Sequence, residues 1–342
     1  MEYPDAVTDD ADRVSRLSWT QLLVICSFSV LAVYCTSMSL ATIDVGTGTV
    51  AATESLKLYR DALAGVRDFP YQWRLLGVYI VYAGERVSGL DPHAIDLAVK
   101  VVLLTASSTM LFLVSRFYVS GMAALCSVAF YQLLTVAGFS DQYAIYFTND
   151  YVMIACWFSA VYCVKTERYV EAAAFTFAGA WAKETMLLVP VLVGIRWLRG
   201  RGAIGPTPFF LTAAAFLIPT IVLRRIYRAP IAEWAWWHML AVNVPFLQSS
   251  LRDIATTLKN NLKVALFFNV LWVLAARAAL RTSDAFEKDL ALTGVVYLLL
   301  AYPVIVLREL RHFLPLAIVV LPLAMQALEG AAAGAPATRP RR

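Results

Sequence analysis

Long apolar stretches separated by short polar segments dominate this chain. The first, Thr20 to Ala41, is about 22 residues long and can cross a hydrocarbon core about 30 Å thick. The later stretches do not alternate apolar with polar residues, which favours helices over the strands of a membrane barrel. We expect helices at residues about 20–42, 71–87, 93–118, 121–138, 150–165, 207–226, 262–280, 288–306 and 312–328, and two short apolar pieces within 169–198.

The composition supports this interpretation. Of the 342 residues, 60% are apolar and 15% are charged, whereas soluble globular chains carry roughly 25% charged residues. We therefore predict an all-α, polytopic membrane helix bundle with about ten membrane helices. It forms one domain over residues 19–330, between a disordered tail at 1–18 and a disordered basic tail at 331–342.

The charges fit a membrane better than a nucleic acid. The net charge of +5 is spread over loops without a basic stripe or an aromatic RNA-binding pattern. All five cysteines lie inside apolar runs, so neither a disulfide framework nor a zinc site is expected. The first apolar run exceeds the h-region of a signal peptide and is expected to remain as an anchor.

Basic residues in short loops predict the orientation. Arg116, Lys165 with Arg168, Arg196 to Arg201, Arg277 to Lys288, and the C-terminal arginines fall on one side if the intervening spans pair as hairpins. That side is expected to be cytoplasmic. Arg13 and Arg16 would lie on the same side if the segment at 71–88 does not fully cross the membrane, which we favour. If that segment did cross, three spans would separate Arg16 from Arg116 and place them on opposite sides. A first loop that re-enters the membrane, or an N-terminal tail on the outer side, would also remove this conflict.

Residues 227–261 are too polar to cross. Trp234, Trp236 and Trp237 are typical of the interfacial aromatic belt. Apolar residues recur at helical spacing from Leu251 to Leu258, which suggests a helix lying flat on the membrane.

The segment from Thr42 to Leu76 offers the first candidate chemistry. Asp44 stands just past the first apolar run and could act as a general base on an acceptor hydroxyl. It could equally be a solvated acid at a helix end. Glu54 and Asp61 follow in the same loop. Either could be a second catalytic acid or a charged residue on a solvent-exposed helix face.

Cations suited to a phosphate stand in three distant segments. Arg74 opens an apolar helix and could clamp a phosphate or snorkel to the interface. Lys183 and Glu184 interrupt an apolar stretch, as a phosphate contact or as a hairpin tip at the surface. Arg308, Glu309, Arg311 and His312 form an anion site or a simple turn. Asp141 and Asp150 flank a polar insert expected on the same outer side, where Asp150 could instead cap a helix.

Other motifs limit the chemistry. Asp96 and Lys100 are one helical turn apart and can pair for structure. His93 and His238 have no partner at metal-ligand spacing. The sequence lacks a P-loop, a dinucleotide fingerprint, HExxH and GxSxG, which weighs against ATP-driven transport and hydrolases.

Several segments resemble the GT-C glycosyltransferase superfamily, integral membrane enzymes that use polyprenyl-phosphate sugars. They are the acid after the first span, PYQWRLL opening the next helix, TNDYVMIACWF, AWAKETMLLVP and LRELRHFLPL, the last similar to the HKEERF-like motif of mannosyltransferases that act in GPI assembly. Family members carry a second acid in the first loop, whereas Val45 and Gly46 follow Asp44 here. A divalent metal stays possible, but its second acidic ligand is missing.

The resemblance implies an inverting transfer at the outer leaflet of the plasma membrane, to a glycan, lipid or protein acceptor. Asp44 would be the base, and Arg74, Lys183, Arg308 and Arg311 would stabilise the departing polyprenyl phosphate. Glu54, Asp141, Asp150, Glu184, Glu309 and His312 would support them. A non-catalytic lipid or solute transporter and an inactive GT-C-like membrane subunit remain alternatives, although no internal transporter repeat is evident.

Overall fold

The computed structural model describes residues 17–47, 61, 74–139, 148–200, 205–226, 240, 243–244, 247, 250–303, 307 and 309–332, without the side chains of 39–47 and 251. Every regular element in these ranges is helical. The elements are α2 (Trp19–Thr47), α4 (Leu76–Ser88), α5 (Pro92–Arg116), α6 (Gly121–Phe139), α7 (Thr148–Lys165), α8 (Tyr169–Ala180), the 3-10 helix η3 (Glu184–Leu187), α9 (Leu188–Leu198), α10 (Thr207–Ile226), α12 (Leu251–Phe268), α13 (Val270–Arg281), α14 (Ala285–Ala301), the 3-10 helix η6 (Leu310–Leu316) and α15 (Ala317–Ala332).

The prediction of a helical, multi-pass membrane protein is confirmed at this level. Among the described residues, five helices are long and apolar enough to cross a membrane, and the bent pair α12–α13 could form a sixth. The five spans are Trp19–Met38, Pro92–Arg116, Gly121–Phe139, Thr207–Ile226 and Leu310–Ala332. The larger number of about ten is not reached by this criterion, and several of the remaining helices, such as α8 and α9, are short.

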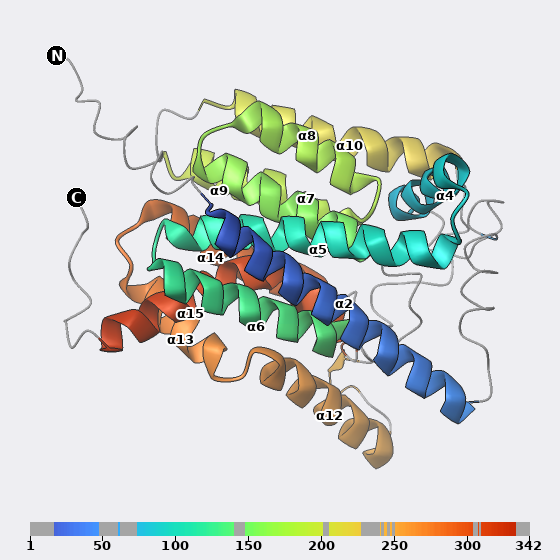
Figure 1. Ribbon diagram of the computed structural model, residues 1–342. Helices are drawn as coiled ribbons and strands as arrows, with labels where there is room; N and C mark the ends of the chain where they lie inside the picture. The colour runs from blue at the N-terminus through green and yellow to red at the C-terminus, as the bar shows by residue number, and fades with distance from the viewer. Residues whose placement is uncertain are drawn as a thin grey trace.

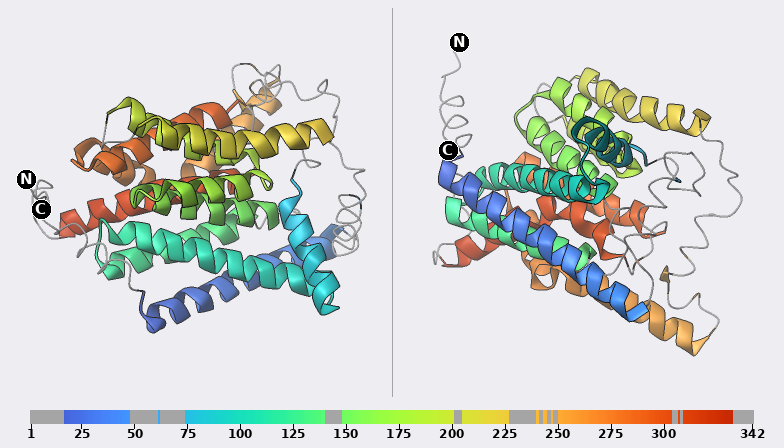
Figure 2. Two further views of the ribbon diagram at one scale, coloured as in Figure 1. Left: turned by 90° about the horizontal axis from the view of Figure 1, so that it is seen from above. Right: turned by 45° about the vertical axis from the view of Figure 1, so that its right-hand side comes forward.

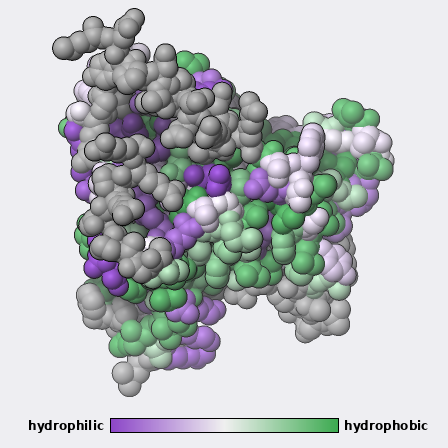
Figure 3. Space-filling view, turned by 60° about the vertical axis from the view of Figure 1, so that its left-hand side comes forward, coloured by the Kyte–Doolittle hydropathy of each residue, from purple (hydrophilic) through white to green (hydrophobic). Residues whose placement is uncertain are grey.

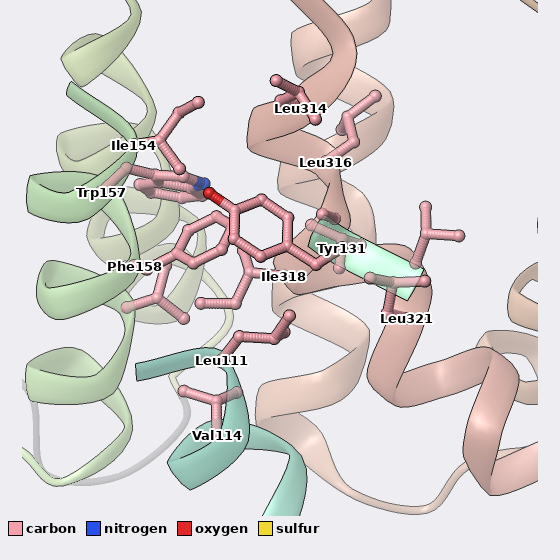
Figure 4. Packing of buried hydrophobic residues seen from close by; sticks show 14 of the residues in the cluster. Leu111, Val114, Tyr131, Ile154, Trp157, Phe158, Leu314, Leu316, Ile318 and Leu321 are labelled. Carbon is pink, nitrogen blue, oxygen red and sulfur yellow. The ribbon is translucent and has the colours of Figure 1, made fainter. Parts of the chain in front are cut away.

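Helix α7 forms the centre of the bundle, and most of its residues are buried. Figure 4 shows Trp157 and Phe158 of α7 packed with Tyr131 of α6 and with Leu314 and Ile318 of the η6–α15 segment. The Trp157 indole nitrogen also donates to the carbonyl of Pro315 at 2.9 Å. The C-terminal segment is thus fixed to the core at the point where η6 passes into α15.

The surface around this core is apolar, as expected of a bundle that meets lipid. Figure 3 shows apolar side chains spread broadly over one face. Large exposed apolar side chains lie on α2, α10 and α14, and include Leu23, Phe210, Leu217, Ile221 and Leu299. A soluble monomer rarely exposes an apolar surface this extensive, because water penalises it.

The two ends of the bundle differ in composition. At one end, called the basic end, Lys165 pairs with Asp284 at 3.2 Å and Arg199 pairs with Asp289 at 2.8 Å. The backbone N–H of Ser120 donates to Glu329 at 3.1 Å, which brings the end of α15 to the same place. The opposite end, called the site end, contains the start of α4, the start of α7, η3 and η6 (Figures 1 and 2).

Helix α4 does not cross the bundle, so that α2 leaves the basic end and α5 returns to it. Its 13 residues rise only about 20 Å, short of a bilayer core of about 30 Å. It begins beside α7 at the site end and turns at Gly89, whose φ of 67° suits glycine. Asp91 then caps α5 by accepting from the backbone of His93 and Ala94, and Pro92 fits the first turn. The expectation that the segment at 71–88 stays short of a full crossing agrees with this geometry.

Several helix boundaries differ from the prediction, and the helix expected at 262–280 is divided at Asn269 between α12 and α13. Helix α2 continues to Thr47 instead of ending near residue 42, because no helix-breaking residue precedes Gly46. Asp44 therefore lies inside the last turn of α2 and not beyond it. The predicted helix at 71–87 begins only at Leu76.

Candidate functional site

A cluster of buried ionic side chains lies at the site end, on α7, η6 and the turn before η3. The Lys183 ammonium contacts one carboxylate oxygen of Asp150 at 2.5 Å. The Arg311 guanidinium contacts the other oxygen at 3.1 Å. The three side chains are no more than 5% exposed. One carboxylate therefore links two cations that lie 33 and 161 positions away in the sequence.

Glu309 and His312 complete this charged cluster. Glu309 accepts from Arg311 at 2.8 Å and lies 3.0 Å from Nε2 of His312. The other ring nitrogen, Nδ1, lies 3.2 Å from the Lys183 ammonium. A neutral imidazole with its proton on Nε2 satisfies both contacts, because Nε2 then donates to Glu309 while Nδ1 accepts from the ammonium.

Three consecutive residues at the start of α7 hold the cluster in place. Thr148 donates to the Asp96 carboxylate of α5. Asn149 accepts from the backbone of Gly77 at 2.7 Å and donates to the carbonyl of Arg74 at 2.8 Å. Asp150 holds Lys183 and Arg311. The first turn of α7 thus binds α5, the start of α4, the turn before η3, and η6.

Arg74 and Glu184 form the more exposed border of the cluster. Their side chains lie 3.4 Å apart and are 17% and 39% exposed. The backbone N–H groups of Leu75 and Leu76 donate to the carbonyl of Trp181, which keeps Arg74 next to the turn that carries Lys183. A shallow recess beside Glu184 is lined by Ala180, Thr220, Leu223 and Arg224. Arg74 and Glu184 are the most exposed of the described side chains in this cluster.

The electrostatic balance is close to neutral. Three cations, Arg74, Lys183 and Arg311, face three carboxylates, Asp150, Glu184 and Glu309. Burial lowers the pKa of Lys183 to about 8, although the Asp150 carboxylate opposes this shift. Burial by itself would raise the pKa of the Glu309 carboxyl, but the hydrogen bond from His312 and the charge of Arg311 hold it well below its ordinary value. Lys183 and Glu309 lie outside the candidate spans.

The structure brings together most of the candidate residues that it describes. Arg74, Asp150, Lys183, Glu184, Glu309, Arg311 and His312 share the site end. Asp44 lies in the last turn of α2, but its side chain is outside the described part. Glu54, Asp141, Arg308 and the tryptophans at 234–237 also lie outside the described residues.

Some simpler interpretations are wrong. Lys183 is not the surface tip of a hairpin, because it is buried and lies between Asp150 and His312. Asp150 is more than a capping residue, because it lies in the first turn of α7 and its carboxylate forms ion pairs with Lys183 and Arg311. The segment containing Arg311 is more than a turn between spans, since Arg311 and His312 are buried there.

The sequence argument missed Thr148 and Asn149. Both are buried, and the only signal was their position before Asp150 in an otherwise apolar helix. The predicted pairing of Asp96 with Lys100 is confirmed, at 2.5 Å and fully inside the bundle. His93 has no metal-like cluster around it, and no group of three acidic, histidine or cysteine side chains among the described residues could hold a metal ion.

Comparison with known proteins assigns nothing further. No family model, no curated protein and no solved structure matches this chain.

Proposed function

We propose that this protein is a membrane glycosyltransferase that transfers a sugar from a polyprenyl-phosphate donor to an acceptor at the outer leaflet, with inversion at the anomeric carbon. The supporting observation is the convergence of Arg74, Lys183 and Arg311 from three distant segments at one end of a helical membrane bundle. Fixed cations at a membrane boundary suit the phosphate of a lipid-linked sugar.

The carboxylates make these cations rigid. Asp150 and Glu309 hold Lys183 and Arg311 in fixed positions before any ligand arrives. Charge that is already oriented stabilises a developing anion without reorganisation during the reaction. Arg74, at the more exposed border, would meet the donor phosphate first, with Lys183 and Arg311 behind it.

Asp44 is the proposed general base. It would take the proton of the acceptor hydroxyl as the hydroxyl oxygen attacks the anomeric carbon. The bond from that carbon to the phosphate oxygen breaks, and its electron pair leaves with the polyprenyl phosphate. Helix α2, which carries Asp44, runs from the basic end toward the site end (Figure 1).

The GT-C likeness belongs to the same proposal. It requires that shorter helices such as α8 and α9 also cross, which gives about ten membrane helices. The chain runs from the basic end to the site end along α8 and back to the basic end along α9, which supports this topology. The site end would be the extracytoplasmic end, because the basic loop residues lie at the other end, and the plasma membrane is the location that the GT-C likeness implies.

A binding protein without catalysis is the second candidate. The near-neutral charge of the cluster favours it, because Asp150 and Glu309 already neutralise Lys183 and Arg311. Such a protein would hold a lipid headgroup or solute, either as a transporter or as an inactive subunit. The two candidates differ in whether a covalent transfer occurs.

A transfer assay in proteoliposomes separates them. Purified protein would receive polyprenyl-phosphate-linked mannose or glucose, and both sugar transfer and binding of the polyprenyl phosphate would be measured. We expect Asp44→Asn to lower transfer about 10²- to 10⁴-fold while phosphate binding persists. Arg74→Ala and Arg311→Ala should weaken phosphate binding about 10- to 100-fold.

The matched control is Arg86→Ala, which removes an exposed cation that contacts Tyr82 on α4, away from the charged cluster. Binding without transfer in the unaltered protein would favour the non-catalytic candidate. Transfer that is unchanged in Asp44→Asn would remove Asp44 from the mechanism. Equal binding by the Arg74, Arg311 and Arg86 variants would exclude the phosphate site.

A further inference from the structure

Helix α12 carries an apolar stripe that no described residue covers. Leu258, Leu262 and Leu266 recur every four residues and are 53%, 58% and 57% exposed. Ala255 and Ala265 fall on the same face at helical spacing and are also exposed. In Figure 1 the helix extends away from the body of the bundle at the site end.

The cations of α12 gather on one flank of this stripe. Arg252, Lys259 and Lys263 are seven and four residues apart, so that they follow one another along the helix beside the leucines. The acidic residue Asp253 lies on the side of the helix turned away from the leucines and accepts from Ser250 at the helix start. The exposed part of α12 is therefore apolar with a positive border.

The remaining face fixes α12 to the protein. Thr257, Phe267 and Phe268 are buried. The Asn261 amide donates to the carbonyl of Asn243 at 3.0 Å and accepts from the Tyr302 hydroxyl at 3.0 Å. The apolar stripe consequently has a fixed orientation, outward from the bundle.

Asn269 sets the direction of the helix. It has a φ of 49° and a ψ of −132°, a backbone conformation that residues other than glycine rarely adopt. The chain bends by 63° there, between α12 and α13. Without the bend, α12 and α13 would form one straight helix. With it, the two helices point in different directions.

We propose that α12 is an interfacial helix that recognises an anionic phospholipid surface. Its leucines would enter the boundary between headgroups and acyl chains, and Arg252, Lys259 and Lys263 would lie at the level of the lipid phosphates. An apolar stripe with cations on its border is the pattern of helices that bind membranes in the plane of the interface. The proposal goes beyond glycosyl transfer, because it concerns the lipid around the site and holds with or without catalysis.

The charge arrangement selects this occupant. A second copy of the chain would have to present both apolar surface and acidic groups in the matching order, whereas an anionic bilayer presents both along its whole surface. Basic residues close to such a surface each strengthen the attraction about fivefold, and salt weakens it.

Depth measurements on the full chain test the placement. The five cysteines would be replaced, and spin labels attached to single cysteines introduced by Ala255→Cys, Thr256→Cys, Leu258→Cys, Asn260→Cys, Leu262→Cys and Leu266→Cys in lipid nanodiscs. We expect labels at 255, 258, 262 and 266 to lie below the phosphates and labels at 256 and 260 to remain in water. Depth that increases steadily from 255 to 266 would indicate a crossing helix and overturn the proposal, as would labels immobilised between two copies.

Lipid composition tests the recognition. The label at Leu262→Cys would be compared in zwitterionic nanodiscs and in nanodiscs containing phosphatidylglycerol. We expect deeper insertion with the anionic lipid. Lys259→Glu combined with Lys263→Glu should make the label at 262 shallower in the anionic nanodiscs, whereas Lys259→Arg with Lys263→Arg should leave its depth unchanged. Equal depth in both lipids for the unaltered charges would reject the anionic selectivity.

Discussion

Asp150 shows how a single buried carboxylate organises the site end. It holds two buried cations, Lys183 on one carboxylate oxygen and Arg311, which also contacts Glu309, on the other. Removing one partner of a buried ionic network leaves an uncompensated charge in a medium of low dielectric constant, which costs far more than losing an exposed pair.

This difference predicts the stability of two variants. Asp150→Asn should lower the free energy of unfolding by about 3–5 kcal/mol, because Lys183 and Arg311 would lose their shared carboxylate. Glu184→Gln should cost at most about 1 kcal/mol, because Glu184 and Arg74 are partly exposed. Thermal unfolding in detergent would measure both variants against the unaltered protein. Similar melting temperatures for the two variants would contradict the central role of Asp150.

Lys183 gives the proposed phosphate site a pH dependence. Its pKa is lowered to about 8, so the ammonium is charged below that pH and neutral above it. Affinity for polyprenyl phosphate should therefore fall as the pH rises from about 7 to about 9. Lys183→Arg keeps its charge over this range and should lose the dependence. Titrations of both proteins at constant ionic strength provide the measurement, and a parallel loss of affinity in the arginine variant would refute the assignment.

At the scale of elements, the start of α7 is the point where separate helices meet. Thr148, Asn149 and Asp150 each bind a different segment, so the position of α4 and of both 3-10 helices depends on one turn. Gly77 allows this approach, because a Cβ atom there would lie only 2.8 Å from the backbone nitrogen of Asn149. The contact between α4 and α7 thus requires glycine.

Gly77→Ala should push α4 away from α7. Overpacking of this kind typically costs about 1–3 kcal/mol. Hydrogen exchange should show faster exchange in α4 and at the amides of Leu75 and Leu76, which donate to Trp181. Gly330→Ala is the control, since a Cβ atom at Gly330 meets nothing within 4 Å. Unchanged protection of α4 in Gly77→Ala would show that the neighbouring backbone can shift without cost.

At the scale of the whole molecule, two charged clusters occupy opposite ends of an apolar bundle. The basic end contains Arg116, Lys165, Arg168, Arg196 and Arg199, several of them paired with acids or stacked on aromatic rings. The site end contains the buried cluster around Asp150. The loop arginines and lysines of the basic end predict that this end faces the cytoplasm.

Labelling of single cysteines tests that orientation. In a chain without its native cysteines, Leu90→Cys would place a thiol in the exposed turn between α4 and α5, and Arg281→Cys would place one at the end of α13. A membrane-impermeant maleimide should react with the first in intact cells, and with the second only after permeabilisation. The reverse pattern would invert the proposed topology and move the site to the cytoplasmic face.

The sequence by itself determined the class of fold and several of its details. Long apolar runs leave helices as the way to satisfy backbone groups in lipid, so the bundle, the short segment at 71–88 and the Asp96–Lys100 pair could be anticipated. Its charged residues, being rare, also indicated where chemistry could occur, because a charge near a membrane core is costly and requires a partner.

The tertiary structure alone decided which charges meet. Lys183 and Arg311 approach Asp150 only because α7 lies at the centre and its first turn contacts η6 and the turn before η3, and these contacts join residues up to 161 positions apart. Periodicity describes each helix separately and contains no information on such long-range packing. The partners of Asn149 were hidden for the same reason, since its hydrogen bonds depend on how closely α4 approaches α7.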